Sequence, residues 1–413
     1  MYFASGAEIR ALYPATRGIR VGYVASGRRT TRIPFHLPET ALERHGVIFG
    51  KQGSGKTVFL KNLLSDNLYG QDGDGLQVPA LVFGHPDLVL ENRSAGTLGL
   101  LALEDDRIVT FGYDRAIKLH PQEIALEDVF HQFPEMSPAM RDLWFHVARR
   151  SPGDFIGRLA RYDVNADPLE LVLRTEQVGA PKKPVQRGVA PRSTVNACIR
   201  QARILGSQLS ASAQPVLSRI ALALQERKTV LVNTYNLSDY GAAFFIRLVL
   251  TRLTRLGERA LHKGRAQRYF VIVDEAQHFL QRAAEEVTEF VRTCRKFGVT
   301  LFFATQSPSC IPTSVYGQLY TTVSFHLSKA DVRALLEVCP ALEDTKHVLL
   351  RPPLKNTLGT AAVSALGYPY PCTIRTEPFE RVVERIRRLR ESLKHEGGTH
   401  DGRRTALPAP ARG

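Results

Sequence analysis

Eight residues from Gly50 to Thr57 carry the clearest chemical signal in the chain. They read Gly-Lys-Gln-Gly-Ser-Gly-Lys-Thr and match the pattern G-x-x-x-x-G-K-[ST] in full. Glycines let backbone N–H groups converge on phosphate oxygens, Lys56 can reach the β and γ phosphates, and the Thr57 hydroxyl can reach Mg²⁺. The pattern predicts a site for a nucleoside triphosphate, ATP, formed by Gly50, Gln52, Gly53, Ser54, Gly55, Lys56, Thr57 and Val58.

A loop of this kind needs a strand before it and a helix after it. Residues 46–49 read as a buried strand. The apolar side chains after the loop recur at spacings that suit a helix buried on one side: Val58, Phe59, Leu60, Leu63 and Leu64. The predicted order is therefore strand, glycine loop and helix, and the helix N-terminus adds positive potential at the phosphates.

Two adjacent carboxylates, Asp274 and Glu275, follow an apolar run at residues 269–273. A buried strand that ends in acids is costly unless a cation meets them. In nucleotide sites of this type an Asp here holds Mg²⁺, and the next Glu orients and deprotonates the attacking water. Alone, such a pair more often caps a helix. With the complete loop upstream, we predict that Thr57 and Asp274 bind Mg²⁺ and that Glu275 is the catalytic base.

Three further residues are weaker candidates. An apolar run at residues 299–304 delivers Gln306 to the same carboxyl edge of the sheet, where its amide could sense the γ-phosphate or could simply satisfy a turn. A helix predicted over residues 282–297 carries Arg292 and Arg295 near its end, before Gly298. Cations in a last turn usually complement the helix dipole, and the alternative is that Arg295 or Arg292 reaches a neighbouring subunit's ATP.

The arrangement of the remaining segments predicts an α/β fold. Strands are expected at 79–83, 107–111 and 229–233, with a helix near 242–261, and this alternation specifies a mostly parallel sheet covered by helices. Residues 1–45 form a short β-rich lead-in, 46–375 a core with a helical insertion at about 120–225, and 376–413 an Arg-rich helix and a disordered tail. We interpret residues 163–193 as a mobile basic loop.

Composition sets the broad class of the protein. The 413 residues are 44% hydrophobic and 23% charged, which fits a globular chain with a real core. Five cysteines without a C-x-x-C pair fit reduced thiols better than a disulfide framework or a zinc site. We expect no membrane span and a cytoplasmic location. A net charge of +15 favours a polyanionic partner such as nucleic acid.

These residues together resemble the HerA/FtsK superfamily of ring-forming translocases, and more closely its HerA-like branch. The resemblance covers roughly residues 40–375. It is carried by ALERHGVIFGKQGSGKT, KTVLVNTYNLSD, VIVDEAQHF and RKFGVTLFFATQSP. It implies a RecA-like P-loop ATPase core that assembles as a homo-oligomer, a hexamer, with ATP between subunits and DNA in a basic channel. Carried over by position, Lys56 binds nucleotide, Glu275 is the base, Gln306 the sensor and Arg295 the arginine finger.

Three positions depart from the family pattern. His85 and Asp87 stand after the second strand, where many relatives carry an acidic, glycine-containing segment, and Thr322 stands where many FtsK-like members have an Arg. The lead-in is also short for the β-barrel of full HerA proteins. The missing N-K-x-D sequence argues against a signalling GTPase.

We interpret the chain as an ATP-driven translocase or helicase on duplex DNA, bound with little sequence preference, with a nuclease or defence effector as a plausible partner. A candidate DNA contact is the basic loop with Lys182, Lys183, Arg187 and Arg192, which could equally be a solvated surface loop. Two alternatives stay open: a type IV secretion or conjugation ATPase that moves protein or a protein-bound DNA strand, and an ATP-dependent ring that serves as a scaffold for an effector.

Overall fold

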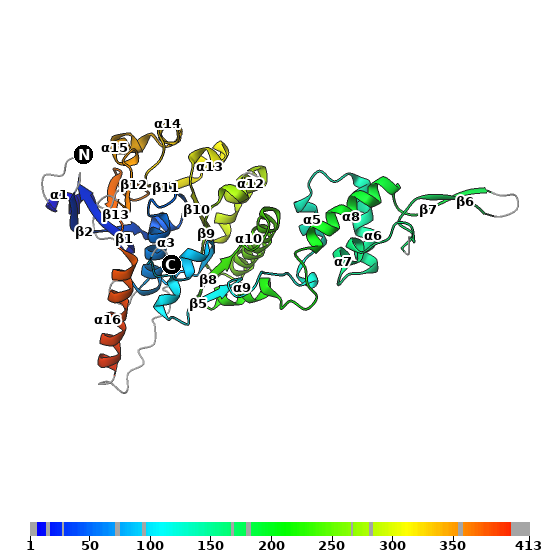
Figure 1. The fold of residues 1–413 in the computed structure, drawn as a ribbon, viewed down its shortest axis with the longest axis horizontal. Coiled ribbons are helices and arrows are strands. Elements are labelled where there is room, and N and C mark those ends of the chain that lie inside the picture. The colour runs from blue at the N-terminus through cyan, green and yellow to red at the C-terminus, as the bar shows by residue number, and fades with distance from the viewer. Residues whose placement is uncertain are drawn as a thin grey trace.

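One sheet of eleven strands runs through the described part of the protein (Figure 1). The computed structural model describes residues 6–13, 17–26, 29–70, 75–92, 96–166, 169–178, 183–265, 267–280, 284–353 and 358–397. The sheet order is β2-β1-β13-β12-β11-β3-β10-β9-β4-β8-β5. The strands are β1 Gly18–Ser26, β2 Arg29–Pro38, β3 His45–Phe49, β4 Ala80–Gly84, β5 Ile108–Phe111, β8 Thr229–Asn233, β9 Tyr269–Val273, β10 Val299–Thr305, β11 Leu319–Ser324, β12 Thr360–Ala365 and β13 Cys372–Arg375.

The expected mostly parallel sheet is confirmed. Every neighbouring pair from β11 through β3, β10, β9, β4 and β8 to β5 is parallel. At the other edge β12, β13, β1 and β2 pair antiparallel, so the β-rich lead-in continues the same sheet. Each strand that the sequence predicted forms within two residues of its expected bounds. Strands β11, β12 and β13 were not predicted, because their runs are short and carry several Thr and Ser residues.

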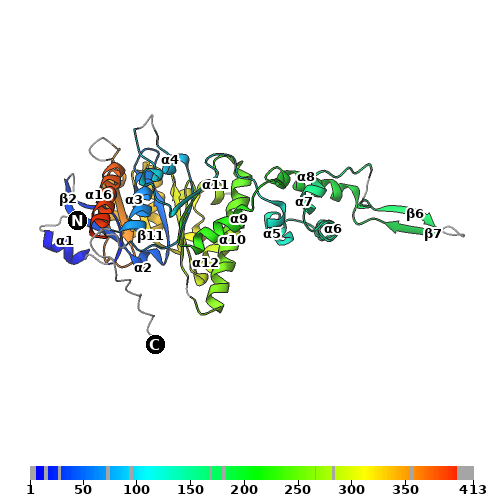
Figure 2. The ribbon, with the colours of Figure 1, turned by 90° about the horizontal axis from the view of Figure 1, so that it is seen from below.

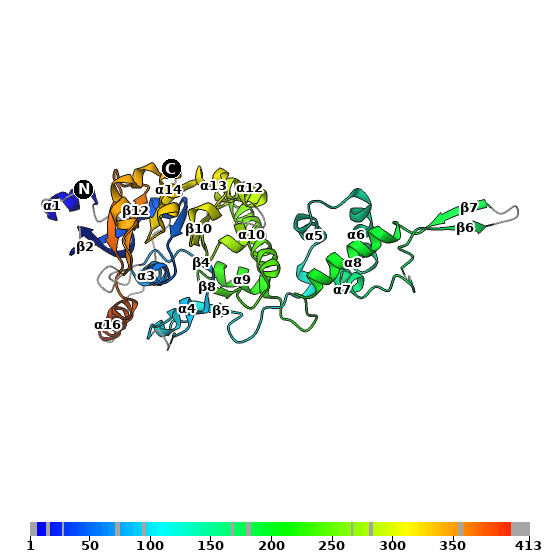
Figure 3. The same ribbon diagram turned by 45° about the horizontal axis from the view of Figure 1, so that its top comes forward.

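Alternate residues of the central strands enter two separate cores. Val47 and Phe49 of β3 belong to one core and Ile48 to the other. Both cores are sealed by helices, which lie above and below the strands in Figure 3. The helices are α1 Gly6–Leu12, α2 Glu39–Leu42, α3 Lys56–Tyr69, α4 Pro86–Val89, α5 Leu126–Gln132, α6 Pro138–Arg150, α7 Phe155–Ala160, α8 Arg192–Gly206, α9 Val216–Gln225, α10 Asp239–His262, α11 Gln277–Leu280, α12 Ala284–Cys294, α13 Thr313–Tyr316, α14 Lys329–Val338, α15 Lys346–Leu349 and α16 Phe379–Gly397, with short 3₁₀ turns η1 Leu100–Leu103, η2 Pro121–Glu123, η3 Arg295–Phe297, η4 Pro308–Cys310 and η5 Pro340–Thr345.

The helix after the glycine loop, α3, differs from its predicted environment. Twelve of its fourteen residues are buried, so the prediction of burial on one side was wrong. Strand β1 and helix α16 cover its polar side and pair with it: the backbone N–H of Arg20 donates to Asp66 Oδ2 at 2.7 Å, and Asn62 Nδ2 donates to the carbonyl of Glu377 at 2.9 Å. Polar side chains can be buried when they are hydrogen-bonded in this way.

The C-terminal helix α16 packs on its own chain. Phe379, Val382, Val383 and Ile386 enter the core that contains α3. Beyond them, Arg390 approaches the carboxylate of Asp105 at 3.3 Å. The expected disordered tail, residues 398–413, lies outside the described residues.

A helical insertion leaves the sheet after β5 and returns before β8. Helices α5 to α8 project from the edge of the sheet, and α9 packs back against α10 and β8 (Figure 1). Within the insertion Trp144 is fully buried, donates from Nε1 to Gln201 at 3.3 Å and meets the ring of Phe155 edge to face at 6.0 Å.

The segment interpreted as a mobile basic loop contains a β-hairpin. Strands β6 Arg174–Val178 and β7 Lys183–Arg187 pair antiparallel, so the loop prediction was wrong for these residues. The β-branched residues Thr175 and Val178 favour extended backbone despite the nearby Gly and Pro residues. In Figure 2 the hairpin lies at the far end of the insertion from the sheet.

No helix in the described ranges is long and apolar enough to cross a membrane.

Asp105 offers a test of how α16 is held. Its side chain is 2% exposed and accepts from Arg107 Nη2 at 2.8 Å and from Tyr69 Oη. Burial alone would raise the pKa of Asp105, but the hydrogen bonds from Arg107 and Tyr69 outweigh burial and hold it well below its usual value. The group therefore stabilises the fold above the carboxyl's unfolded pKa of about 4, and this contribution is lost as pH falls further.

We expect Asp105→Asn to lower the free energy of unfolding by about 1–3 kcal/mol at neutral pH, because it leaves two partly exposed arginines without their carboxylate. The difference from wild type should shrink as pH falls below about 4. Chemical denaturation measures both quantities, with exposed Asp106→Asn as the matched control. Equal stability of the two variants at pH 7 would contradict this role of Asp105.

Candidate functional site

The glycine loop, residues 50–55, lies between β3 and α3 at the carboxyl end of the parallel strands, as predicted. It is fixed by the two neighbouring strands: the N–H of Gly50 donates to Thr305 O at 3.2 Å and the N–H of Lys51 donates to His326 O at 3.1 Å. Gly55 has φ +117°, and a Cβ there would lie 2.8 Å from the Cα of Gly359. Only glycine fits this position, because both the backbone angle and the available space exclude a side chain.

Lys56 begins α3 and is buried inside the loop. Its Nζ donates to the carbonyl of Gly50 at 2.6 Å and lies 4.0 Å from Oε1 of Glu275. Burial lowers the pKa of Lys56, and the nearby carboxylates of Glu275 and Asp274 oppose that shift. The buried Ser54 Oγ has no hydrogen-bond partner among the described residues. A cation and an unpaired hydroxyl at the N-terminus of a helix suit a phosphate ligand.

Asp274 and Glu275 follow β9 at the same edge of the sheet. Asp274 Oδ1 accepts from the N–H of Glu275 at 3.0 Å. Burial, and then the charge of Glu275, raise the pKa of Asp274 to about 6. Glu275 has φ +49°, a left-handed conformation that is strained for a residue with a side chain. The backbone thus holds two like charges together, which favours a cation between them and a phosphate.

Gln306 reaches the same carboxylate, as its place after β10 predicted. Its Nε2 donates to Glu275 Oε2 at 3.1 Å. Gln277, which sequence reasoning missed, donates to the same oxygen at 2.5 Å and accepts from Thr305 Oγ1 at 3.0 Å. Its signal was its position two residues after Glu275 in the run VIVDEAQHF. Both amides orient the Glu275 carboxylate and leave Oε1 on the side of Lys56.

Arg295 lies apart from this cluster. It begins the 3₁₀ turn η3 before β10, at the opposite edge of the sheet, and its exposed side chain donates from Nε to the carbonyl of Glu43 at 3.2 Å. Arg292 is also exposed, on α12. Within one chain the structure does not bring either arginine to the glycine loop, so a role in hydrolysis would require a second copy of the chain.

Two pairings of side chains around the site were not predicted from the sequence. Lys51 Nζ lies 2.7 Å from Oδ2 of Asp331 and joins the loop to α14. The rings of His85 and Tyr235 meet edge to face, with 4.5 Å between centroids. Burial, and then the charges of Asp274, Glu275 and Asp87, raise the pKa of Tyr235. Neither pair could be predicted, because each joins segments far apart in the sequence.

These side chains fit a nucleoside triphosphate with Mg²⁺. The hydroxyl of Thr57 and the carboxylate of Asp274 are the oxygen donors that Mg²⁺ prefers, with phosphate oxygens and water completing its shell. Bound Mg²⁺ would neutralise charge on the phosphates.

No family model and no curated protein matches the sequence. Solved structures do match its fold. The bacterial conjugative coupling protein TrwBΔN70, unbound, has a TM-score of 0.59 at 14% identity, covering 91% of this chain and 92% of that one. Plasmid coupling protein TrwB with the ATP analogue ADPNP and with ADP and Mg²⁺ gives 0.57 at 14% identity, covering 91% and 93%. The chain therefore has a RecA-like P-loop NTPase fold, as expected.

From the raised pKa of Asp274 we predict how the stability of the fold depends on pH. Because ionisation of this carboxyl is disfavoured in the fold, its contribution to stability falls as pH rises from about 4, the unfolded value, through about 6. With metal and nucleotide removed, we expect Asp274→Asn to be more stable than wild type at pH 8, by up to about 2 kcal/mol, and equally stable at pH 4. Thermal unfolding at a fixed heating rate measures the difference.

Asp142→Asn on α6, an exposed change of the same kind, should show no such dependence on pH. If Asp274→Asn is the less stable protein at pH 8, the carboxylate is stabilised by its neighbours and the account given for its pKa is wrong.

Proposed function

We propose that this protein is a Mg²⁺-dependent ATPase that drives the movement of DNA, of the type represented by conjugative coupling proteins. The observation that carries the proposal is the convergence of Lys56 and Gln306 on the two oxygens of Glu275, at 4.0 and 3.1 Å. An inert phosphate-binding turn would need neither the strained Glu275 nor the amides that orient it.

The residues divide the chemistry among them. Lys56, the loop N–H groups and Ser54 bind the β and γ phosphates, and Thr57 and Asp274 hold Mg²⁺. Glu275 accepts the proton of the attacking water, because it is the carboxylate that two side-chain amides aim towards Lys56. Gln306 connects this base to β10 and so to the loop, since the N–H of Gly50 donates to Thr305 O. A change at the γ-phosphate can therefore move β10.

The particular branch is revised by the comparisons. The sequence interpretation favoured a HerA-like translocase and kept a secretion or conjugation ATPase as the alternative. The likeness to TrwB favours that alternative, because it extends over 91% of this chain and is not limited to the residues around the loop. We propose a homo-oligomeric ring, a hexamer, with the basic character of the chain serving DNA binding. The HerA branch and a nuclease or effector partner stay predictions from the sequence.

ATP hydrolysis with and without DNA tests this function. At low salt we expect linear duplex or single-stranded DNA to stimulate the steady-state rate, and Glu275→Gln to lower it by on the order of 10²-fold or more while nucleotide binding persists. Preference for the single strand would support the coupling type and preference for the duplex the HerA type. Hydrolysis that ignores both DNAs would contradict a DNA motor and favour an effector scaffold.

Mixing two inactive variants tests whether Arg295 acts between subunits. Arg295→Ala keeps the base and Glu275→Gln keeps the arginine, so a mixed ring contains interfaces with both groups intact. We expect Arg295→Ala alone to lose on the order of 10³-fold in rate and Glu275→Gln alone on the order of 10²-fold or more. The mixture should regain a measurable part of the lost rate. The mixture of Arg292→Ala with Glu275→Gln, each assayed alone as well, is the matched control. If the hydrolysis rate of the mixture of Arg295→Ala and Glu275→Gln proteins equals the sum of the rates of the two separate proteins, Arg295 does not act as an arginine finger.

A further inference from the structure

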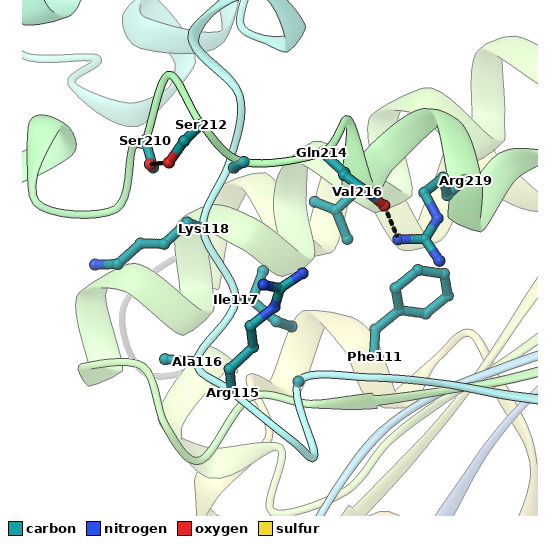
Figure 4. Close-up of a pocket in the computed structure, with 12 residues that line it drawn as sticks. Phe111, Arg115, Ala116, Ile117, Lys118, Ser210, Ser212, Gln214, Val216 and Arg219 are labelled. Carbon is teal, nitrogen blue, oxygen red and sulfur yellow. Dashed lines mark hydrogen bonds between the residues drawn. The ribbon is translucent and has the colours of Figure 1, made fainter.

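A cavity of about 210 Å³ lies where the helical insertion joins the sheet (Figure 4). Its walls are the segment that leaves the sheet after β5 and the segment that returns before α9. Backbone hydrogen bonds hold the two segments together, from Leu119 N to Gln208 O at 2.9 Å and from Ser210 N to Leu119 O at 3.0 Å. The polar side chains that line it are Arg115, Lys118, Ser210, Ser212, Gln214 and Arg219.

The charge in this cavity is of one sign. Arg115, Lys118 and Arg219 line it, and none of the lining residues, all of them within the described ranges, carries a carboxylate. Like charges gathered in one cavity repel, and an anion would relieve that cost. Two of the three cations are held by the protein: Arg219 donates to Gln214 at 2.8 Å and lies over the ring of Phe111, and Lys118 donates to Ser207 O at 2.6 Å.

Arg115 is the cation that the protein leaves available. Within the described part of the chain it has neither a hydrogen bond nor an ion pair, and Figure 4 shows its guanidinium directed into the cavity. An arginine is the side chain best suited to bind a phosphate, because its planar fork matches two of the phosphate oxygens.

The size of the cavity limits the ligand. Its volume is below the ~300–1,000 Å³ of pockets that enclose a drug-sized molecule. A phosphate group fits, whereas a nucleotide would leave its base outside. Hydroxyls of Ser210 and Ser212, 2.9 Å apart, are further donors for phosphate oxygens.

The floor of the cavity is connected to the nucleotide site. The carbonyl of Gly112 accepts from Asn233 Nδ2 at 3.0 Å and from Asn236 Nδ2 at 3.1 Å. Between these asparagines stands Tyr235, whose N–H donates to Asn233 Oδ1 and whose ring meets that of His85 edge to face. His85 follows β4, and the carbonyl of Phe83 in β4 accepts from the N–H of Asp274 at 2.8 Å. On the other side of Gly112, burial and then the charge of Asp274 raise the pKa of Tyr113.

We propose that this cavity binds a phosphate of the DNA backbone, contacted by Arg115, and that its occupancy acts on the nucleotide site through Gly112 and the turn after β8. The inference rests on the proposed function as a DNA motor. It places a DNA contact where the insertion joins the sheet, at the same edge of the sheet as the glycine loop. Movement of the bound DNA strand and movement of Asp274 then act on the same segment of backbone.

Salt-dependent DNA binding by the chain of residues 1–413 is the test. The probe is a short fluorescein-labelled DNA, duplex or single-stranded, followed by anisotropy at several salt concentrations. Losing one phosphate contact should lower the slope of log K against log salt by about 1, so we expect that change in Arg115→Gln and a wild-type slope in Arg115→Lys. Arg381→Gln on α16, exposed and remote, is the matched loss of charge and should keep the wild-type slope. Circular dichroism confirms that each variant folds.

The second readout is the ratio of the hydrolysis rate with DNA to the rate without it. A change that affects only the nucleotide site alters both rates by the same factor and leaves this ratio unchanged. We expect this ratio to fall towards one in Arg115→Gln and to stay at the wild-type value in Arg381→Gln. Wild-type slope and ratio in Arg115→Gln would overturn the inference. An Arg115→Gln protein that binds DNA normally but has lost inhibition by inorganic phosphate would instead assign the cavity to a free anion. Wild-type protein that neither binds DNA nor responds to it overturns the proposed function itself.

Discussion

The placement of four charged side chains depends on the alignment of the carboxyl ends of β3, β9 and β10. Lys56 and Asp274 are desolvated at this edge, Glu275 lies 4.0 Å from Lys56, and Lys51 is fixed beside them by Asp331. Charges that are partly removed from water are tolerated only when opposite charges and hydrogen bonds are placed accurately around them. The parallel register supplies that accuracy, because Phe303 of β10 lies opposite both Val47 of β3 and Val273 of β9.

The remaining architecture supports this edge from both sides. Helix α3 is covered by α16 and β1, and so its first turn, which carries Lys56 and Thr57, is anchored to the C-terminal segment. On the other side, the insertion leaves the sheet at the end of β5 and returns before β8. The carbonyl of Gly112, where the insertion begins, accepts from Asn233 and Asn236 in the turn after β8. A force on the insertion therefore acts on this turn, which is an arrangement that the proposed coupling of hydrolysis to movement requires.

The likeness to coupling proteins and the sequence resemblance to HerA proteins agree on the fold of the core, and they lead to different proposals for what the protein moves. The core alone does not separate the two, since the roles proposed for Lys56, Asp274, Glu275 and Gln306 are the same in either case. The parts that distinguish motors of one fold are the appended ones. Here these are the insertion with its β6–β7 hairpin and the cavity at its root, and both lie outside the motifs that carried the resemblance.

The sequence by itself determined the strand, loop and helix around Lys56, the carboxylates after β9, and the place of Gln306 after β10. These features are local: a glycine pattern or an apolar run fixes them within about ten residues. Only the tertiary structure decided the contacts of Gln277, the pair of His85 and Tyr235, the burial of α3 on its polar side, and the cavity around Arg115. Each of these joins segments distant along the chain or depends on a neighbouring backbone, and no local pattern records which distant residue will lie opposite another.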